Sequence, residues 1–506
     1  MILRLSGISK RFGALQANDA IDLEVRRGEV VALLGENGAG KTTLMNILFG
    51  HYTADQGHIE AFGHLLPPGS PDAAIRAGIG MVHQHFTLAD NLSVLENIVL
   101  GTEPLWQPFW RPRAGRRRIA DLAARFGLAV DPDARVGELS VGERQRVEIL
   151  KALYRDARLL ILDEPTAVLT PQESEQLFAT LRAFVAQGLS VVFISHKLNE
   201  VLAVSERIVV LRSGRVVADR PRAGVDAGEL ATLMVGRAVP EPEKPVLVAG
   251  PVVLRLDDVS VDGGTAARRL ARASLEVQAS EIVAIAGVAG NGQAALADLV
   301  AGILRPAQGT LMLRDRTLPA ATPSEMMSLG VGRVPEDRLD TGVIGDMSLW
   351  QNAIIERLRA PEFCRLGLLR RQQAIDFTNG LIESFDVRCP GPAAITRLLS
   401  GGNMQKMILG RALTGRPALV LAHQPTRGLD VGAVAYVHRR LIEARSEGAA
   451  ILLISEDLDE ILRLADRIAV IYRGRLSPAM KAEHFSIAEL GAAMAGHGVF
   501  EDQHAV

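Results

Sequence analysis

Residues 35–42 read Gly-Glu-Asn-Gly-Ala-Gly-Lys-Thr, a glycine-rich stretch that ends in a lysine and a hydroxyl residue. This spacing is suited to holding phosphate groups, because the glycines let backbone N–H groups turn toward them where side chains would block the approach. Lys41 can reach the β- and γ-phosphates of a nucleoside triphosphate such as ATP, and the Thr42 hydroxyl can bind Mg²⁺. The predicted phosphate-binding residues are Gly35, Glu36, Asn37, Gly38, Ala39, Gly40, Lys41, Thr42 and Thr43.

Two acidic residues follow an apolar run in the segment Leu-Leu-Ile-Leu-Asp-Glu-Pro at 159–165. The run would bring Asp163 to the end of a buried strand, where its carboxylate can hold Mg²⁺ through water. Glu164 would then lie near the γ-phosphate and polarise an attacking water as the general base. A surface turn is the plain alternative for Asp-Glu-Pro, but its distance behind a phosphate-binding loop favours the catalytic interpretation.

Three further side chains are candidates for the same site. His196 follows a predicted strand and could contact the γ-phosphate, although a lone histidine is usually structural. Gln84 could bind both Mg²⁺ and the attacking water. Phe12 could stack on adenine, and an aromatic residue of the core is the equal alternative. His83 and His85 resemble a metal pair, but no Cys or acidic cluster completes such a site, so we expect no metal there.

The elements that must position these residues alternate between strand and helix. Residues 30–34 are an apolar run before the glycine-rich loop, and residues 42–49 have a helical pattern after it. Helical regions are also predicted at about 92–155 and 349–413, with strand–helix alternation on either side. Such alternation predicts an α/β fold with a parallel sheet flanked by helices.

The sequence carries the same set of segments twice. Residues 28–50 recur at 280–302, an offset of 252. Three later segments, 139–153, 159–166 and 191–202, recur in the same order 260 residues further on. Since the order is preserved with a single slip, the chain is predicted to be a tandem duplication.

Composition excludes several classes of protein. The 506 residues contain 56 Lys+Arg against 58 Asp+Glu, without the basic excess that is typical of nucleic-acid binders, so we expect no nucleic acid as a partner. The chain has only two cysteines, so we expect no disulfide framework, and a reducing compartment fits this count. No run of about 18 apolar residues is present, so we expect an intracellular protein that does not cross a membrane by itself.

With Leu-Ser-Val-Gly-Glu at 139–143, Leu-Ser-Gly-Gly-Asn at 399–403 and the two motifs above, the chain resembles the ATP-binding cassette (ABC) ATPases over nearly its full length. The resemblance implies two tandem P-loop nucleotide-binding domains. Each would have a RecA-like α/β core, an antiparallel β subdomain and a helical subdomain with the signature sequence. It also implies that two cassettes, here both within one chain, pair head to tail, so that each ATP lies between one P-loop and the other signature.

The resemblance allows the two halves to be compared position by position. The altered positions of the second half are Gln293 for the P-loop lysine, Ala294 for the Mg²⁺ hydroxyl, His423 for the metal aspartate, Gln424 for the catalytic glutamate, Glu456 for the switch histidine and Glu336 for Gln84. The second half keeps an intact signature, Ser400, Gly401 and Gly402, and Asp430 in the following loop. The first half has Val141 in its signature and Thr170 in place of that aspartate. Head-to-tail pairing then predicts one working and one degenerate ATP site.

Several strings are similar to those of twin-cassette subunits of simple-sugar and nucleoside importers, among them Val-Pro-Glu-Asp-Arg at 334–338 and Gln-Pro-Thr-Arg-Gly-Leu-Asp at 424–430. The second string favours nucleosides, with a simple sugar as the alternative. The resemblance implies two transmembrane permease subunits, an extracytoplasmic solute-binding protein and a peripheral place on the cytoplasmic face of the inner membrane. A twin-cassette ATPase acting on ribosomes or DNA and a non-catalytic scaffold are the rival interpretations.

The predicted domains are residues 1–236 and 252–498, separated by a linker at 237–251 that is rich in Pro, Glu and Lys, and followed by a tail at 499–506. A basic stretch at 110–118 is interpreted as a solvated start of the helical region. A contact with phospholipid headgroups or with the membrane partner is its alternative.

Overall fold

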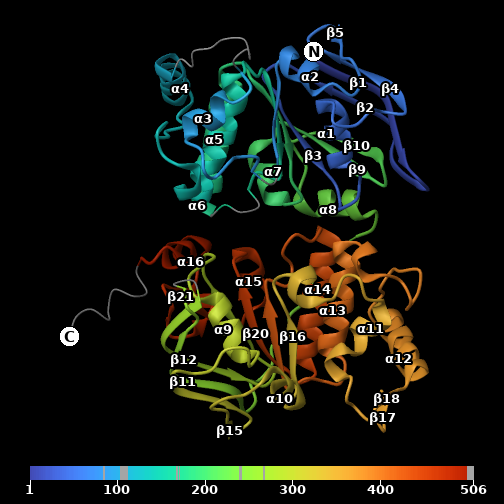
Figure 1. Cartoon of the computed structure of the whole chain (residues 1–506), viewed down its shortest axis with the longest axis vertical. Coiled ribbons are helices and arrows are strands. Elements are labelled where there is room, and N and C mark those ends of the chain that lie inside the picture. Colours follow the sequence, from blue (N-terminus) through green and yellow to red (C-terminus); the bar gives the residue numbers. More distant parts are fainter. Residues whose placement is uncertain are drawn as a thin grey trace, which may run out of the picture. The chain divides into compact units, whose positions relative to one another are not determined.

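The computed structural model describes residues 1–83, 86–102, 112–166, 169, 171–238, 242–265 and 268–497. The chain divides into two compact units, Met1–Val239 with Asp430–Gly432, and Pro240–Leu429 with Ala433–Val506. Each unit contains an antiparallel sheet, a mainly parallel sheet and a set of helices (Figure 1).

The first unit opens with an antiparallel sheet of four strands in the order β2-β1-β4-β5. Leu5 pairs with Leu23 on one side and with Ile59 on the other, and all three side chains are buried. Alternating apolar residues therefore give this sheet one buried face. The strands are β1 (Leu3–Phe12), β2 (Leu15–Val25), β4 (Gln56–Ala61) and β5 (His64–Leu65).

The second sheet of this unit has six strands in the order β10-β9-β3-β8-β7-β6. Its central strands are parallel, and every residue of β3, β7 and β8 is buried, as expected for strands covered on both faces. The strands are β3 (Val30–Leu34), β6 (Ile79–Val82), β7 (Leu159–Asp163), β8 (Ser190–Ile194), β9 (Arg207–Arg212) and β10 (Arg215–Pro221).

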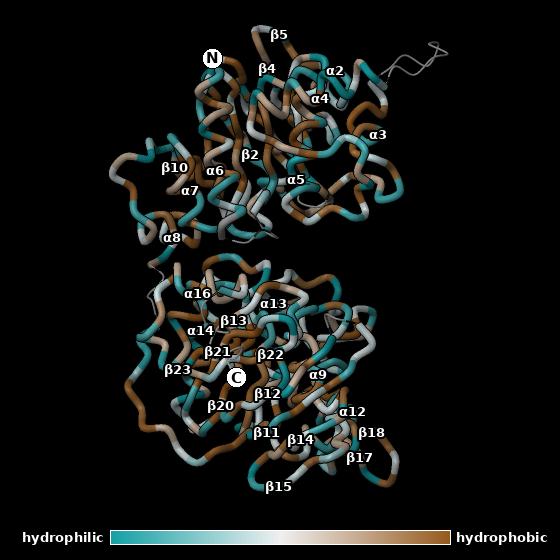
Figure 2. The backbone as a smooth tube through the Cα atoms, turned by 90° about the vertical axis from the view of Figure 1, so that its left-hand side faces the viewer, coloured by the Kyte–Doolittle hydropathy of each residue, from teal (hydrophilic) through white to brown (hydrophobic). Residues whose placement is uncertain are grey.

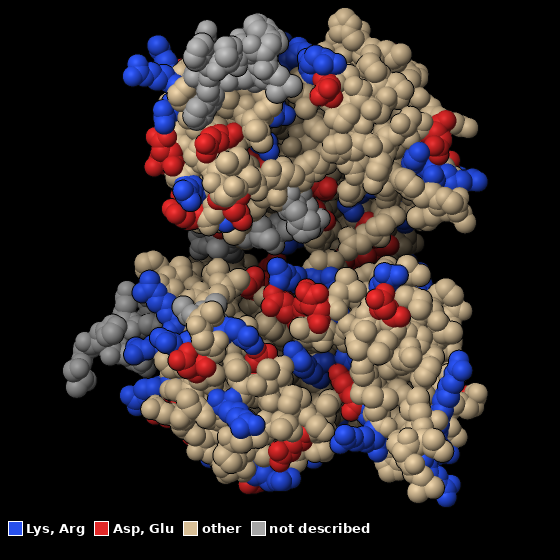
Figure 3. All heavy atoms as spheres, in the orientation of Figure 1, with Lys and Arg blue, Asp and Glu red and all other residues tan. Residues whose placement is uncertain are grey.

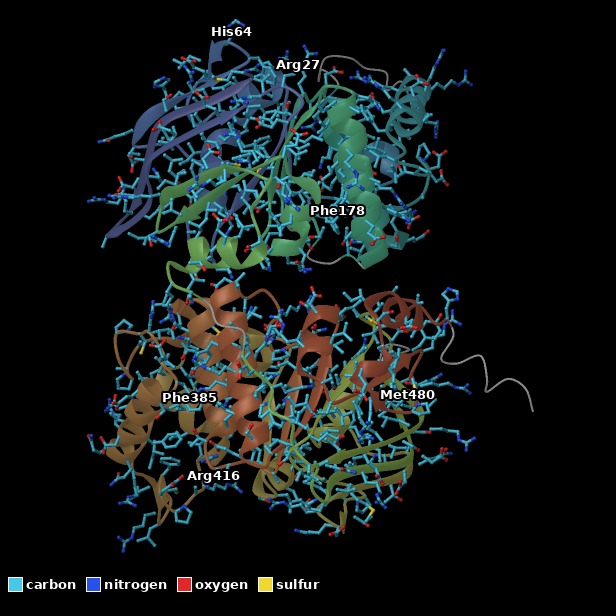
Figure 4. All side chains as sticks on the ribbon, turned by 180° about the vertical axis from the view of Figure 1, so that it is seen from behind. Arg27, His64, Phe178, Phe385, Arg416 and Met480 are labelled. Atoms are coloured by element: carbon cyan, nitrogen blue, oxygen red, sulfur yellow. The ribbon has the colours of Figure 1, made fainter. Side chains whose placement is uncertain are left out.

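Helices cover the parallel sheet of the first unit. Phe178 of α6 is labelled in Figure 4. Its ring packs edge to face against Phe193 of β8, with 6.2 Å between ring centroids. The helices are α1 (Lys41–Phe49), α2 (Pro71–Ala77), α3 (Val94–Val99), α4 (Pro112–Phe126), α5 (Val141–Tyr154), α6 (Pro171–Ala186), α7 (Leu198–Val204) and α8 (Ala227–Val235).

The second unit repeats this plan. Its antiparallel sheet has the order β12-β11-β14-β15, and β16-β19-β20-β13-β21-β22 form the larger sheet, with β23 paired to β21. The central strands β13 and β20 are brown in Figure 2 because they are almost wholly apolar. The strands are β11 (Val252–Asp262), β12 (Arg269–Gln278), β13 (Ile282–Ala286), β14 (Gln308–Leu313), β15 (Arg316–Thr317), β16 (Val331–Val334), β19 (Leu419–His423), β20 (Ala450–Ser455), β21 (Arg467–Tyr472), β22 (Arg475–Leu476) and β23 (Met480–Lys481).

The helices of the second unit follow the same order as those of the first, and the connection at 103–111 of the first unit lies outside the described residues. A two-stranded hairpin, β17 (Cys364–Arg365) and β18 (Leu368–Leu369), lies between α11 and α12. The helices are α9 (Gln293–Val300), α10 (Pro323–Ser328), α11 (Leu349–Ile354), α12 (Arg371–Ser384), α13 (Gly401–Leu413), α14 (Val431–Ser446), α15 (Leu458–Leu464) and α16 (Ile487–Met494).

The structure confirms the predicted duplication and the α/β class. Strands β3 and β13 begin 252 residues apart, at Val30 and Ile282, and β7 and β19 begin 260 residues apart, at Leu159 and Leu419. Both offsets are those of the sequence repeat.

In both units a buried carboxylate on a helix binds residues that follow two strands of the parallel sheet; in the first unit these are α7, β7 and β8. In the first unit Glu200 accepts hydrogen bonds from Thr166 Oγ1 at 2.5 Å and from Ser195 Oγ at 3.0 Å. The same three residue types recur 260 positions later, where Glu460 accepts from Thr426 at 2.8 Å and Ser455 at 2.6 Å. This network satisfies polar groups that burial would otherwise leave unpaired.

The described part of the basic stretch 110–118 lies on α4. Arg116 pairs with Asp133 at 2.6 Å, and Arg118 pairs with Asp156 at 2.8 Å. These are exposed ion pairs, in keeping with a solvated helix face. Of the helices described, none has the length and apolar character needed to cross a membrane.

Candidate functional site

The glycine-rich loop of the first unit connects the end of β3 to the start of α1. A side chain at Gly35 would place its Cβ 2.4 Å from the carbonyl oxygen of Leu211, and one at Gly40 would lie 2.3 Å from that of Ala17. Gly40 also has a φ of 99°, in the left-handed region that favours glycine. The backbone can take this path only with glycine at these positions, and the loop places Glu36, Asn37, Gly38 and Ala39 between them.

Lys41 begins α1 and is the charged group of this loop. Its side chain is buried, and Nζ donates to the carbonyl oxygens of Gly35 at 2.7 Å and Glu36 at 3.0 Å. Burial lowers the pKa of Lys41, and the carboxylates of Glu164 and Asp163 oppose that shift. The ammonium group is therefore held against the loop, where a phosphate would displace backbone oxygens as its partner.

The two hydroxyl residues of the predicted site follow Lys41 in the first turn of α1. Thr42 is exposed and Thr43 is half-buried. The N-cap residue of α1 is Gly40, which has no side chain to cap the helix. The N–H groups at the start of α1 would therefore stabilise an anion, and Thr42 supplies a hydroxyl oxygen there for a counter-ion.

Asp163 ends β7 and supplies a buried carboxylate. Burial, together with the negative charge of Glu164, raises the pKa of Asp163 to about 6, while Lys41 lowers it. A buried carboxylate with a raised pKa is a group that a cation would stabilise. Asp163 and Thr42 provide oxygen donors, which Mg²⁺ prefers, so these residues fit that ion.

Glu164 is positioned by strained backbone at the end of β7. Its φ is 48°, an uncommon value for a residue with a side chain, and its N–H donates to the carbonyl oxygen of Ile194 at 2.9 Å. Nδ1 of His196 lies 2.9 Å from Oε1 of Glu164. Burial would raise the pKa of Glu164, but the hydrogen bond and charge of His196 and the charge of Lys41 hold it below its ordinary value. Glu164 is thus kept ionised, as a general base requires.

Two more of the predicted site residues are Phe12 and Gln84. Phe12 ends β1 with 43% of its surface exposed, and its ring meets Tyr52 edge to face at 5.6 Å. It is therefore not a core residue. Gln84, like His85, lies outside the described residues, while His83 stacks on His51 with 5.8 Å between ring centroids.

The second glycine-rich loop is closed by its own side chain. The amide Nε2 of Gln293 donates to the carbonyl oxygen of Val288 at 2.7 Å, and Oε1 accepts from the N–H of Asn291 at 3.0 Å. Asn291 corresponds to Ala39 in the first loop. The Gln293 side chain therefore binds the N–H of Asn291, a backbone group of the kind that binds phosphate in such loops. Ala294 has no hydroxyl to bind Mg²⁺.

The remaining positions of the second loop region differ in charge from their counterparts. His423 is buried at the end of β19, and its Nε2 lies 3.6 Å from Glu336, which also pairs with Arg427. Burial lowers the pKa of His423, and Glu336 opposes that shift. Gln424 repeats the strained backbone of Glu164 with a φ of 49°, and its Oε1 accepts from the N–H of Glu456 at 3.4 Å. The geometry of the strand ends is retained without the ionised base.

The first signature sequence ends in a carboxylate that engages its own serine. Ser140 is the N-cap of α5, and its hydroxyl donates to Glu143 at 2.8 Å while the Glu143 N–H donates back at 3.3 Å. These hydrogen bonds hold the pKa of Glu143 below its ordinary value. The side chain of Val141 is 40% exposed beside them. A negative charge at this helix start opposes the binding of a phosphate.

The second signature sequence has a neutral residue in place of that carboxylate. Ser400 is exposed at the start of α13, next to Gly401 and Gly402, and accepts a hydrogen bond from Nδ2 of Asn403 at 2.9 Å. Among the contacts of the described residues, the Ser400 hydroxyl acts only as an acceptor, so its proton is available to a ligand. Asp430 is half-buried and directly precedes α14.

Glu143 and Asn403 are functional candidates that the motif comparison missed. The signal was present, because Ser-x-x-Glu before a helix is the pattern of a capping box and Ser-x-x-Asn is not. Sequence comparison treated only Val141 as the defect of the first signature. The structure shows in addition that the Ser140 hydroxyl is hydrogen-bonded to Glu143, whose carboxylate is negatively charged.

The chain is similar to known proteins over nearly its full length. The sequence profile described as ABC transporter matches residues 18–167 and 270–427. The nucleoside import ATP-binding protein of Lactococcus lactis is 42% identical over 99% of this chain and 99% of its own length. The guanosine import ATP-binding protein of Bacillus subtilis is 42% identical over 98% and 97%. The glucose import ATP-binding protein of Haloferax volcanii is 44% identical over 98% and 96%.

A solved structure also matches nearly the full chain. It is the complex of an archaeal ribosomal stalk protein with an archaeal ribosome recycling factor, with a TM-score of 0.63 over 94% of this chain and 90% of that chain. The sequences are 19% identical, so this likeness supports the fold alone.

Proposed function

The chain belongs to the ABC transporter family, and on that premise we propose that it is the ATP-hydrolysing subunit of an importer for nucleosides or related compounds. The family predicted from the motifs is thereby confirmed. The observation that carries the proposal is the hydrogen-bonded pair of Glu164 and His196 beside the buried Lys41. This arrangement is that of an ATPase site with an ionised base.

In the proposed reaction the loop N–H groups and Lys41 bind the phosphates of ATP. Thr42 and Asp163 would hold Mg²⁺, which neutralises charge on the phosphates when bound. Glu164 accepts a proton from the attacking water, and His196 orients the Glu164 carboxylate and donates toward the γ-phosphate. Gln84 is proposed to bind Mg²⁺ and the water, and Phe12 to stack on adenine.

We further propose that the second signature serves the ATP held by the first P-loop. Ser400, Gly401 and Gly402 present a helix start, backbone N–H groups and a free hydroxyl proton, all of which favour an anion. Asp430 is proposed to act beside them. The first signature, with its bound Glu143, is proposed to face the degenerate loop.

The solute is proposed from the relatives. The relatives of Lactococcus and Bacillus are named for nucleoside and guanosine import, and the relative of Haloferax for glucose import. A nucleoside is therefore the proposed solute. A simple sugar is the alternative, and the name of the Haloferax relative supports it.

The remaining parts of the proposal concern assembly. Two transmembrane permease subunits would bind this chain at the cytoplasmic face of the cell membrane, and a solute-binding protein would act on the other side. The two cassettes would pair within the chain, with domains at 1–236 and 252–498, a linker at 237–251 and a tail at 499–506. Nucleic acid has no place in this function.

Uptake of labelled solutes tests the proposal. Deleting the gene should abolish high-affinity uptake of one compound in a panel of adenosine, guanosine, uridine, ribose, galactose and xylose. Complementation with Glu164→Gln should fail, and complementation with the native chain should succeed. Loss of ribose or galactose uptake alone would move the solute to the sugars, and unchanged uptake of the whole panel would contradict both alternatives.

A further inference from the structure

The hairpin between α11 and α12 has an unusual turn. Cys364 pairs with Leu369 and Arg365 with Leu368, so two residues, Leu366 and Gly367, reverse the chain. Their φ values are 52° and 80°. Turns with two positive φ values normally contain Asn-Gly or Asp-Gly, because a bulky side chain is strained in the left-handed region. A leucine at this position is unfavourable for the fold.

The same leucine is almost completely exposed. Leu366 is 95% exposed, Leu368 is 74% exposed and Leu369 is 45% exposed. The base of the hairpin is fixed, since Phe363 is buried and meets Phe377 edge to face at 5.2 Å. The hairpin lies at the end of the second unit, next to α12 (Figure 1), and its apolar residues are brown in Figure 2. The packed base of the hairpin thus holds its leucine side chains exposed to solvent.

Arginines flank the leucines on both sides. Arg365, Arg370 and Arg371 are all exposed, and no ion pair of theirs is found within the described ranges. From Phe363 to Ile375 the sequence has no acidic residue. Figure 3 shows blue atoms among tan ones at the lower right, where the second unit carries this hairpin. The exposed carboxylates Glu362 and Asp376 bound this stretch, and the guanidinium of Arg371 lies 5.6 Å from the ring centroid of Trp350. The tip between them therefore combines apolar side chains with an excess of positive charge.

We propose that this hairpin contacts an anionic lipid surface. Leu366 and Leu368 enter the boundary between headgroups and acyl chains, while the arginines bind lipid phosphates. Charge favours lipid over a protein loop as the occupant, because cytoplasmic loops of membrane proteins carry an excess of Lys and Arg and would repel these arginines.

The first half has the same kind of composition at the corresponding connection. Residues 103–111 read Glu-Pro-Leu-Trp-Gln-Pro-Phe-Trp-Arg and precede the arginine-rich start of α4. They lie outside the described residues, and the proposal does not depend on them. The two connections differ in sequence, but both combine apolar and basic residues.

One hairpin gives a weak contact. A single myristoyl chain supports only marginal, reversible membrane binding, and stable anchoring needs two signals. The hairpin accordingly adds to an attachment made through protein partners and does not replace it. The inference is separate from the proposed ATPase activity, because it concerns a surface that no site residue occupies.

Vesicle flotation with the purified full chain tests the inference. The native chain should float with vesicles of phosphatidylcholine and phosphatidylglycerol, and much less with phosphatidylcholine alone. Leu366→Asn installs the residue that the turn prefers, so the fold should be kept or stabilised, yet vesicle binding should fall at least about fivefold. Thermal unfolding and ATP hydrolysis in solution should be unchanged or improved in this variant.

Two further variants separate the parts of the contact. Arg365→Gln combined with Arg370→Gln and Arg371→Gln should remove the preference for the anionic vesicles. Leu65→Asn is the matched control, since Leu65 is 65% exposed on β5, and it should bind as the native chain does. The inference is overturned if the native chain shows no preference for anionic vesicles, if Leu366→Asn binds equally well, or if Leu65→Asn loses binding to the same degree.

Discussion

The two glycine-rich loops of this chain share a backbone but differ in how they balance buried charge. In the first, the ammonium group of Lys41 is buried near the carboxylates of Asp163 and Glu164. In the second, Gln293 is neutral and hydrogen-bonds to its own loop, and a buried histidine and an amide stand where the carboxylates were.

This difference indicates that the lysine and the two carboxylates depend on one another. A buried lysine without its carboxylates, or buried carboxylates without the lysine, would leave a charge that is costly to bury. Replacing Lys41 by an amide and the Asp163–Glu164 pair by His423–Gln424 removes both signs together. At these three positions the second half therefore buries no lysine and no carboxylate, and the nearby carboxylate of Glu336 is paired with Arg427.

The largest expected effect comes from the base. Glu164→Gln should lower the ATP hydrolysis rate by about 10² to 10⁴, because the general base is lost. Nucleotide affinity should remain, since Lys41 and the loop are unchanged. Steady-state hydrolysis and binding of a fluorescent ATP analogue measure the two effects. Gln424→Ala, the matched change in the second half, should leave the rate within about twofold, and equal losses in both variants would contradict the comparison.

Lys41 is expected to have the next largest effect. Lys41→Ala removes a charged hydrogen-bond donor to phosphate, so nucleotide affinity should fall roughly tenfold to a hundredfold. Gln293→Ala removes only hydrogen bonds within its loop and should change the affinity of the first site very little. Titration of both variants with the ATP analogue compares them. If the two changes weakened binding equally, the loops would be equivalent in function.

The signature sequences allow a reciprocal exchange. Asn403→Glu should let the new carboxylate accept a hydrogen bond from the Ser400 hydroxyl and place negative charge at the start of α13, so we expect hydrolysis to fall about tenfold. Glu143→Asn should have little effect, because that signature is proposed to face the degenerate loop. Hydrolysis rates of the two variants decide the matter, and a larger loss for Glu143→Asn would reverse the assignment.

The smallest effect is expected from restoring one lysine. Gln293→Lys should not create a second active site, because His423, Gln424 and Glu456 remain in place of the metal and catalytic residues. The change also introduces a buried ammonium group without its carboxylates, so the thermal stability of the second unit should decrease. Counting turnover per chain is the check. A doubled rate would show that the other substitutions matter less than the lysine.

Much of the architecture could be predicted from the sequence. The repeat offsets alone predict the equivalence of β3 with β13 and of β7 with β19, because apolar strands and glycine-rich loops depend on local pattern. The same pattern placed Lys41 at a helix start and Asp163 at a strand end. Family membership followed from these motifs and was confirmed by the comparisons.

Side-chain contacts could not be predicted in the same way. The Gln293 amide turns back onto Val288 and Asn291, which depends on a rotamer and not on a residue type. The hairpin at Leu366 was also missed, because turn rules expect Asn or Asp where the chain has a strained leucine. Sequence rules describe what the fold prefers, and both features depart from that preference.

The buried network of Glu200, Thr166 and Ser195 has a consequence for the history of this chain. Its copy at Glu460, Thr426 and Ser455 kept all three residue types, while the neighbouring catalytic positions changed. After a gene duplicates, each copy must still fold, but one working site is enough for hydrolysis. Residues kept in only one copy are therefore expected to serve hydrolysis. Buried residues kept in both copies, such as this network, are expected to serve folding.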